Sequence, residues 1–395
     1  MKKAILIIGL GLFFATNIIA QNTPAILSMK ERARVIDELL EDKIETVLPQ
    51  IMQREGLDMW IVISREYNED PVIKTLLPAT WHAARRRTIL VMFDRGNGKG
   101  VEKLAVARYD VGTNFKKAWN PEEEPDQWER LAEIIKERDP KKIGVNKSKH
   151  FGITDGIVAT ELEELQRVLG KKYSSRIVSA EKVAIAWLET RTPKEMAIYP
   201  QIVRIAHNII AEGFSDAVIQ PGVTTTEDVV WWYRERIREL KLITWFHPSV
   251  SIQRADPESF DHLRTFDSRP GNNVIMPGDL IHVDFGVTYL RLNTDTQQHA
   301  YILRPGETEV PAYLQKAFEN GNRLQDIFTN NFKEGRTGNE VLKMSREQAI
   351  SEGIKPSIYT HPIGYHGHAS GTTLGMWRSS IYGRLSASLK HCLFY

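Results

Sequence analysis

Hydrophobic positions alternate between two spacings along residues 28–190. Apolar residues three and four positions apart predict helices over residues 29–53, 126–137 and 154–169. Short apolar runs rich in Val, Ile and Leu predict strands over residues 59–64, 88–93, 103–108 and 142–146. Helices that alternate with strands are typical of α/β organisation. We therefore predict an α/β domain over residues 21–190 with a mixed or parallel sheet.

The pattern changes near Thr190, where we predict a domain boundary. Thr192 and Glu195 have the spacing of a capping box, so a helix is predicted from here to about residue 214, with a kink at Pro200. Further helices are predicted at 224–240, capped by Thr224 with Glu227, at 312–333, and at 338–352, capped by Thr337 with Glu340. Short strands separate them. Residues 191–377 are thus predicted to form a separate α+β domain.

The first twenty residues have the pattern of a secretory signal peptide. Lys2 and Lys3 precede an apolar run that ends at Ala20, and a basic start, a short apolar stretch and a small final residue are typical of a cleaved signal. An uncleaved N-terminal anchor is the alternative. We expect export to the periplasm or the medium, with no membrane attachment after cleavage.

Charge and cysteine content exclude several classes of function. Lys and Arg exceed Asp and Glu by only 52 to 50, which argues against a nucleic-acid partner. Cys392 is the single cysteine, which excludes an intramolecular disulfide, an all-cysteine zinc site and an iron–sulfur cluster held by four thiolates.

Two aspartates lie in and beside predicted strands of the second domain. Asp284 stands among Val and Phe in the apolar run of residues 280–286, and Asp295 follows eleven residues later. A carboxylate in such a run is costly to bury unless it is paired or bound to a metal. Two antiparallel strands joined by a short turn would bring both carboxylates to one face, where they suit one or two divalent ions. The alternative is two unrelated loop acids.

Three histidines follow within eight residues, at His361, His366 and His368. Two glycines in the same stretch allow the backbone to approach closely, and histidine serves both as a metal ligand and in proton transfer near neutral pH. Each histidine alone could equally be a structural or surface residue. The order Asp, Asp, His is the more informative signal.

These residues resemble the metallopeptidase family of methionine aminopeptidase, aminopeptidase P and prolidase, which also includes creatinase. The resemblance rests on Asp284, Asp295, His361 and His368 in that order, and it covers roughly residues 28–377. It implies that the second domain has the α+β "pita-bread" fold. The first domain is similar to that of aminopeptidase P, prolidase and creatinase, which methionine aminopeptidase lacks. The two-domain layout and the export signal favour an Xaa-Pro peptidase.

The resemblance also implies roles for single residues. Asp284 would be a bidentate ligand of one metal ion, Asp295 would bridge two, and His361 would bind the other. His368 would be catalytic and stabilise the tetrahedral intermediate. His366, with His262 or the alternative His247, would bind substrate.

The implied reaction is hydrolysis by a hydroxide that bridges two ions of manganese, cobalt or zinc. The implied partners are short proline-containing peptides, and a homodimer is left open.

The sequence departs from the family after the histidines. The family has two further glutamate ligands there, whereas residues 353–395 contain neither Asp nor Glu. We interpret residues 378–395 as an aberrant tail that replaces the last strands, the alternative being a genuine short variant with a reorganised site. One metal ion or none is therefore expected, with little peptidase activity.

Two other functions remain open: a non-catalytic peptide- or protein-binding module, and a creatinase-like C–N hydrolase without metal. The two retained aspartates argue against the second.

Overall fold

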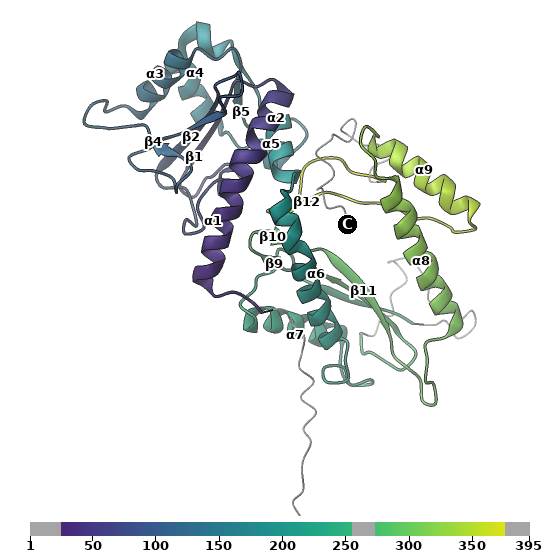
Figure 1. Ribbon diagram of the computed structural model, residues 1–395. Helices are drawn as coiled ribbons and strands as arrows, with labels where there is room; N and C mark the ends of the chain where they lie inside the picture. Colours follow the sequence, from purple (N-terminus) through teal and green to yellow (C-terminus); the bar gives the residue numbers. More distant parts are fainter. Residues whose placement is uncertain (1–24, 255–272, 376–395) are drawn as a thin grey trace, which may run out of the picture.

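The computed structural model describes residues 25–254 and 273–375. The predicted signal peptide, the predicted tail over residues 378–395 and His262 lie outside these residues. The described chain is divided between an α/β domain and a second domain that begins at α6 (Pro193–Gly213), as Figure 1 shows.

The first domain is built on a six-stranded sheet with the order β4-β3-β2-β1-β5-β6. Its strands are β1 (Met59–Arg65), β2 (Arg87–Asp94), β3 (Val101–Val106), β4 (Lys116–Lys117), β5 (Ile143–Val145) and β6 (Ile177–Ser179). β2 is antiparallel to both β1 and β3, whereas β5 is parallel to β1 and β6. Of the two predicted alternatives, a mixed or a parallel sheet, the sheet is mixed.

Helices cover both faces of this sheet, so its central strands are buried on both sides. Along β1, Trp60 and Val62 belong to one apolar cluster, whereas Met59 and Ile61 belong to the other, as the alternation of side chains along a strand requires. The first cluster includes residues of α1 (Met29–Thr46), α2 (Leu48–Glu55) and α5 (Glu181–Glu189), and the second those of α3 (Gln127–Arg138) and α4 (Ala159–Ser174). Single-turn helices η1 (Ile73–Thr75) and η2 (Gly152–Thr154) complete the domain.

Two helix predictions in this domain are wrong in their bounds. The helix predicted over residues 29–53 is two helices that meet at Val47. Pro49 lies in the first turn of the second helix, where its missing N–H costs no hydrogen bond. The helix predicted from residue 154 begins at Ala159, after η2.

The second domain combines a three-stranded sheet, two small hairpins and four helices among its described residues. The sheet has the order β11-β8-β7 and is antiparallel throughout. The strands are β7 (Ser249–Gln253), β8 (Leu280–Phe285), β9 (Thr288–Tyr289), β10 (Leu292–Asn293), β11 (Thr296–Tyr301), β12 (Ile363–Gly364) and β13 (Gly367–His368). The helices are α6, α7 (Thr226–Glu239), α8 (Ala312–Asn331) and α9 (Gly338–Ser351).

Capping boxes begin three of these helices. Those of α6, at Thr192 with Glu195, and of α9, at Thr337 with Glu340, are confirmed. The box predicted for α7 is displaced by one residue, to Thr225 with Asp228. Asp is one bond shorter than Glu, yet its carboxylate accepts the Thr225 N–H at 2.8 Å. Pro200 lies inside α6, and the predicted kink there stays a prediction.

The two domains are joined by α1 and by hydrogen bonds across a long separation in sequence. Val35 and Ile36 of α1 pack on the core of the second domain, whereas Leu40 and Ile44 belong to that of the first. The Leu27 N–H donates to the Tyr289 hydroxyl at 2.9 Å, across 262 residues. The chain that enters α1 is thus attached to the second domain before it reaches the first.

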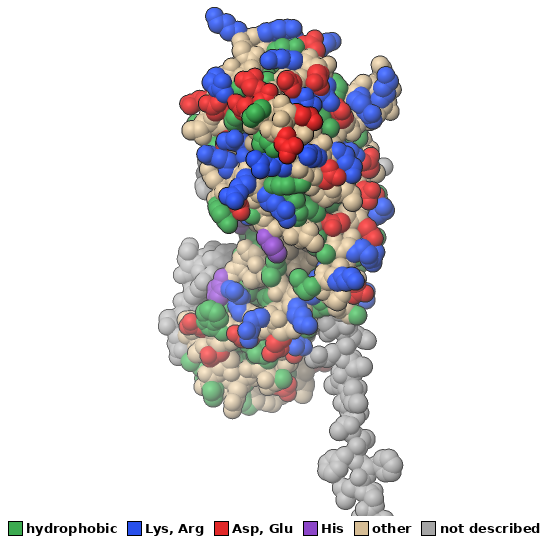
Figure 2. All heavy atoms as spheres, turned by 90° about the vertical axis from the view of Figure 1, so that its left-hand side faces the viewer, with side chains coloured by type: hydrophobic (Ala, Val, Ile, Leu, Met, Phe, Trp, Pro, Cys, Tyr) green, Lys and Arg blue, Asp and Glu red, His purple; other side chains and the backbone are tan. Residues whose placement is uncertain are grey.

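The surface view in Figure 2 shows acidic and basic side chains mixed over the first domain, with hydrophobic side chains in small groups between them. Charges of both signs on one face produce no large field of a single sign there. Within residues 25–254 and 273–375, no helix combines the length and the hydropathy of a membrane span.

Candidate metal centre

Asp284 and Asp295 are brought together by the pairing of β8 with β11. Asp284 is the penultimate residue of β8 and lies opposite Gln297, while Asp295 directly precedes β11. The link between the strands is itself a hairpin, β9 with β10, rather than the simple turn predicted. Leu290 and Arg291 form its tip at φ 56° and 63°, the positive values that a type I′ hairpin turn requires.

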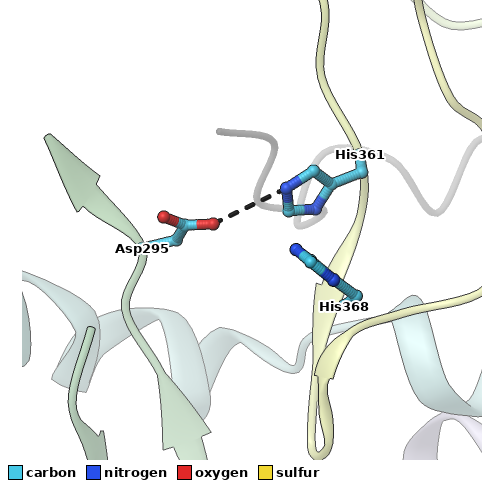
Figure 3. A group of neighbouring side chains, drawn as sticks. All are labelled: Asp295, His361 and His368. Carbon is cyan, nitrogen blue, oxygen red and sulfur yellow. Dashed lines mark ion pairs between the residues drawn. The ribbon is translucent and has the colours of Figure 1, made fainter. Parts of the chain in front are cut away.

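The histidines come from the other small hairpin. His361 lies two residues before β12, and His368 ends β13, where it is opposite Ile363. Figure 3 shows both imidazoles in front of the Asp295 carboxylate, with the strand of Asp295 on one side and the histidine hairpin on the other. Two hairpins far apart in the sequence thus supply the site from opposite sides.

Three side chains form a compact group of metal-ligating atoms. One ligand atom from each of Asp295, His361 and His368 lies within 4.8 Å of the others. His361 Nε2 is 3.6 Å from Asp295 Oδ2, and the His361 and His368 ring centroids are 4.4 Å apart at an interplanar angle of 80°. Asp284 is outside this group, whereas His368, predicted as catalytic rather than as a ligand, is inside it.

Asp284 is attached to the group through Asp295. The two carboxyl groups lie close enough to influence each other's ionisation. Burial raises the pKa of both carboxyl groups. The neighbouring Asp284 adds to the effect of burial on Asp295, and the pKa of Asp295 is raised to about 6. Two adjacent carboxylates repel each other unless a proton or a cation lies between them.

The donor set fits a divalent cation. Asp284 Oδ1 is buried and has no hydrogen-bond partner among the described residues. A buried carboxylate oxygen without a partner is costly, and a bound cation would remove that cost. Carboxylate oxygens beside imidazole nitrogens are the ligands that zinc and manganese ions take in proteins.

The histidines predicted to bind substrate are divided. His366 Nε2 donates to the Pro71 carbonyl at 2.9 Å, so this ring attaches the β12–β13 turn to the first domain and lies outside the metal-ligating group. Burial is the main cause that lowers the pKa of His366. His262 lies outside the described residues. Its alternative, His247, contacts the exposed Trp231 ring at 5.3 Å and Arg234 at 3.0 Å.

Two polar features near the site were missed from the sequence. His282 precedes Asp284 by two residues on β8 and lies opposite His299, with 4.9 Å between the ring centroids. The alternation of side chains along a strand could have placed His282 on the face of Asp284. The Glu189 carboxylate lies against the backbone of Gly371, where an added Cβ atom would be 2.3 Å from Glu189 Oε2. Burial raises the pKa of Glu189 to about 7. Its contact comes from the tertiary fold, so no local signal in the sequence could have indicated it.

Residues 201–381 match the family model of metallopeptidase family M24. No curated protein matches the chain in sequence. Among solved structures, an X-Pro aminopeptidase from Thermotoga maritima MSB8 is similar with a TM-score of 0.56 at 16% identity, over 81% of this chain and 83% of that one.

Two further structures are similar at equally low identity. An Xaa-Pro dipeptidase from Bacillus anthracis gives a TM-score of 0.53 at 15% identity over 90% and 86% of the two chains. A dipeptidase from Pyrococcus horikoshii OT3 gives a TM-score of 0.51 at 18% identity over 87% of each chain. These likenesses cover both domains and confirm the predicted fold, an α/β domain followed by a pita-bread domain.

Proposed function

We propose that this chain, whose residues 201–381 match the model of metallopeptidase family M24, is a metal-dependent peptidase that acts at Xaa-Pro bonds. The observation that carries the proposal is the meeting of two hairpins, which sets the Asp284 and Asp295 carboxyls against the imidazoles of His361 and His368. The proline specificity is supported by the solved structures of similar fold, which include an X-Pro aminopeptidase and an Xaa-Pro dipeptidase.

In this proposal Asp284, Asp295 and His361 hold the metal. A divalent ion of manganese, cobalt or zinc would polarise the scissile carbonyl and lower the pKa of water. The two aspartates supply the negative charge that a dication needs, and the orphaned Asp284 Oδ1 supplies an oxygen without a competing partner. Three ligands suit one ion better than two, because little protein charge would offset the repulsion between two dications.

His368 is the proposed catalytic residue. It is exposed at the rim of the group while its ring lies against His361, so a substrate can reach it. Burial and the nearby His361 lower the pKa of His368, which favours the neutral imidazole at neutral pH. A neutral ring N–H can donate a hydrogen bond to the oxygen on which charge develops during attack on the peptide carbonyl.

A non-catalytic peptide-binding role is the second candidate. The observation that favours it is the lack of Asp and Glu in residues 353–395, because this stretch then supplies no further carboxylate beside the histidines. A creatinase-like hydrolase without metal is not favoured, because the buried acidic pair suits a cation.

We also propose export of the chain, on the pattern of residues 1–20 alone.

Metal stoichiometry and a dipeptide panel test the proposal together. Calorimetric titration of the chain with manganese(II) is expected to give one bound ion, and the loaded protein is expected to cleave Xaa-Pro but not matched Xaa-Ala peptides. Saturable binding of Xaa-Pro peptides without turnover would instead favour the binding module. A chain that binds neither metal nor peptide would overturn both.

A further inference from the structure

Trp245, in the segment between α7 and β7, contacts the backbone on both sides of the candidate metal centre. Its indole Nε1–H donates to the Thr294 carbonyl at 2.8 Å. Thr294 directly precedes Asp295, so this bond holds the backbone from which the Asp295 side chain projects. The indole is half-buried, and this bond satisfies its only donor.

Two glycines allow the indole to lie this close. A Cβ atom at Gly286 would lie 2.7 Å from Trp245 Nε1, and one at Gly367 would lie 2.0 Å from Trp245 Cε3. Both distances are shorter than carbon and nitrogen atoms tolerate. A side chain at Gly367 would displace the ring, whereas one at Gly286 would also meet the Thr294 carbonyl oxygen at 2.4 Å and Phe246 Cε1 at 2.5 Å. Gly286 is two residues after Asp284, and Gly367 directly precedes His368.

The same ring supports His368 directly. The Trp245 and His368 centroids are 5.1 Å apart at an interplanar angle of 73°, which is the edge-to-face arrangement that aromatic pairs favour. The indole also packs against Phe246, with 4.4 Å between the ring centroids. One aromatic side chain therefore touches the segment after Asp284, the segment before Asp295, and His368 itself.

The segment that carries Trp245 is fastened in turn. The Thr244 hydroxyl lies 2.7 Å from the Gly286 carbonyl and 2.6 Å from the Phe246 carbonyl. The Thr288 N–H donates to the Ile243 carbonyl at 2.7 Å. These bonds attach residues 243–246 to the strand connection beside Asp284, so the indole has a fixed base.

We propose that Trp245 is a positioning residue that sets the separation between the acidic pair on β8 and β11 and the histidines of the β12–β13 hairpin. The inference rests on the proposed function, since it assigns Trp245 a role toward the metal site. The ring lies between two hairpins that supply different ligands, and it contacts the backbone or side chain next to each of them. Ligand atoms must be held within a fraction of an ångström for tight binding.

Two substitutions separate positioning from packing. Trp245→Phe keeps an aromatic ring but removes the donor to Thr294, and Trp245→Ala removes both. We expect manganese(II) to bind at least tenfold more weakly to Trp245→Ala than to the native chain. Trp245→Phe is expected to lose less affinity for manganese(II), and to lose it although the melting temperature of this variant is close to that of the native chain. Trp231→Ala is the matched control, because Trp231 is 54% exposed, and it is expected to bind metal as the native chain does.

A double-mutant cycle tests the wedge itself. Gly367→Ala should weaken metal binding because the new methyl group collides with the indole. In the Trp245→Ala background the same change should have a much smaller effect, since the indole is gone. The backbone strain at Gly367, where φ is +95°, is common to both backgrounds and cancels in the cycle. Additive effects would contradict the proposed contact.

A metal-free measurement keeps the inference separate from the proposed function. In the apo protein, Trp245→Ala is expected to accelerate amide hydrogen exchange at least tenfold at residues 294–296 and 367–368, with no change in β1 and β2. If the native chain binds no metal but exchange accelerates in this way, the proposed function fails and the positioning by Trp245 stands. Unchanged exchange, or native metal affinity in both Trp245 variants, would overturn the inference.

Discussion

Asp284 and Asp295 are neighbours in a partly buried site that holds two acids and two imidazoles. Each group is costly to bury alone, and together they are complementary to a cation. The Asp284 oxygen without a partner is the clearest sign of this, because native proteins rarely leave such an atom unsatisfied. At the scale of single residues, the site is more fully explained with a metal than without one.

Replacing Asp284 tests that interpretation. Asp284→Ala is expected to abolish the binding of manganese(II), because it removes one of two carboxylates and leaves a single negative charge to face the ion. Isothermal titration calorimetry measures the effect. Asp216→Ala is the control, since Asp216 is an exposed acid on the same domain. Native metal affinity in Asp284→Ala would show that the ligands have been assigned wrongly.

Asp70 gives a prediction about pH. Burial raises its pKa to about 6 from 3.8, although the Val72 N–H and the Asn146 amide donate to it. The folded state therefore holds this proton more tightly than the unfolded state. The contribution of Asp70 to stability is favourable below pH 3.8 and is lost as the pH rises through about 6, with a total change of about 3 kcal/mol.

Asp70→Asn cannot titrate and isolates this contribution. Urea unfolding of both proteins at several pH values gives the difference in free energy of unfolding. We expect the variant to gain stability relative to the native chain between pH 4 and pH 7, whatever its absolute stability. A difference that does not depend on pH would show that Asp70 keeps an ordinary pKa in the fold.

At the scale of elements, two glycines show how the space around a position decides whether alanine there raises or lowers the free energy of unfolding. Gly144 lies in β5, where a Cβ would meet Leu57 Cδ2 at 2.5 Å, whereas Gly321 lies in α8 with nothing within 4 Å. We expect Gly144→Ala to lower the free energy of unfolding by about 1–3 kcal/mol through overpacking. Gly321→Ala should raise it by about 0.5–1 kcal/mol, because alanine is the better helix former. Chemical unfolding compares the two, and the same sign for both would contradict the packing.

Elements whose signals are local could be predicted from the sequence. The capping boxes at Thr192 and Thr337 need residues only three positions apart, and β1 and β2 follow from their apolar runs. The break at Val47 could have been found, since Pro49 marks the first turn of a new helix. The displaced cap at Thr225 could not, because Thr224 with Glu227 and Thr225 with Asp228 offer equivalent local chemistry.

The candidate site was predictable only as far as neighbouring strands determine it. Asp284 and Asp295 meet because β8 and β11 pair, and that pairing is encoded in one stretch of chain. The bond of His366 to Pro71 spans 295 residues, and no spacing rule connects them. The indole of Trp245 between Gly286 and Gly367 is of the same kind, since it depends on three segments meeting in the fold.

Arg291 joins the domains at the scale of the whole molecule. From the tip of the β9–β10 hairpin, its guanidinium donates to the Leu77 carbonyl at 2.7 Å and to the Pro78 carbonyl at 3.2 Å. Burial lowers the pKa of Arg291, and this cost is offset by the charge-assisted bonds. The contact lies beside the loop that leads to the acidic pair, so it connects the first domain to the metal centre.

Arg291→Ala is expected to lower the stability of the domain interface by about 1.5–3 kcal/mol, the range for hydrogen bonds to a charged group. Differential scanning calorimetry should then resolve two transitions, or a broader one, where the native chain gives one. Arg238→Ala is the control, because its partner Glu235 is a surface neighbour on one helix turn and such pairs contribute little. A native-like transition in Arg291→Ala would show that the hairpin is not needed to couple the domains.

The hydrogen bond from Leu27 to Tyr289 has a consequence for the order of synthesis. The two residues are 262 positions apart, and ribosomes add roughly 5–20 residues per second. The segment that enters α1 therefore leaves the ribosome roughly 13–52 s before its partner exists. During that interval the core that Val35 and Ile36 cover is incomplete. The nascent chain thus exposes these two apolar side chains of α1 while the second domain is being synthesised, and we expect a chaperone to bind the helix there.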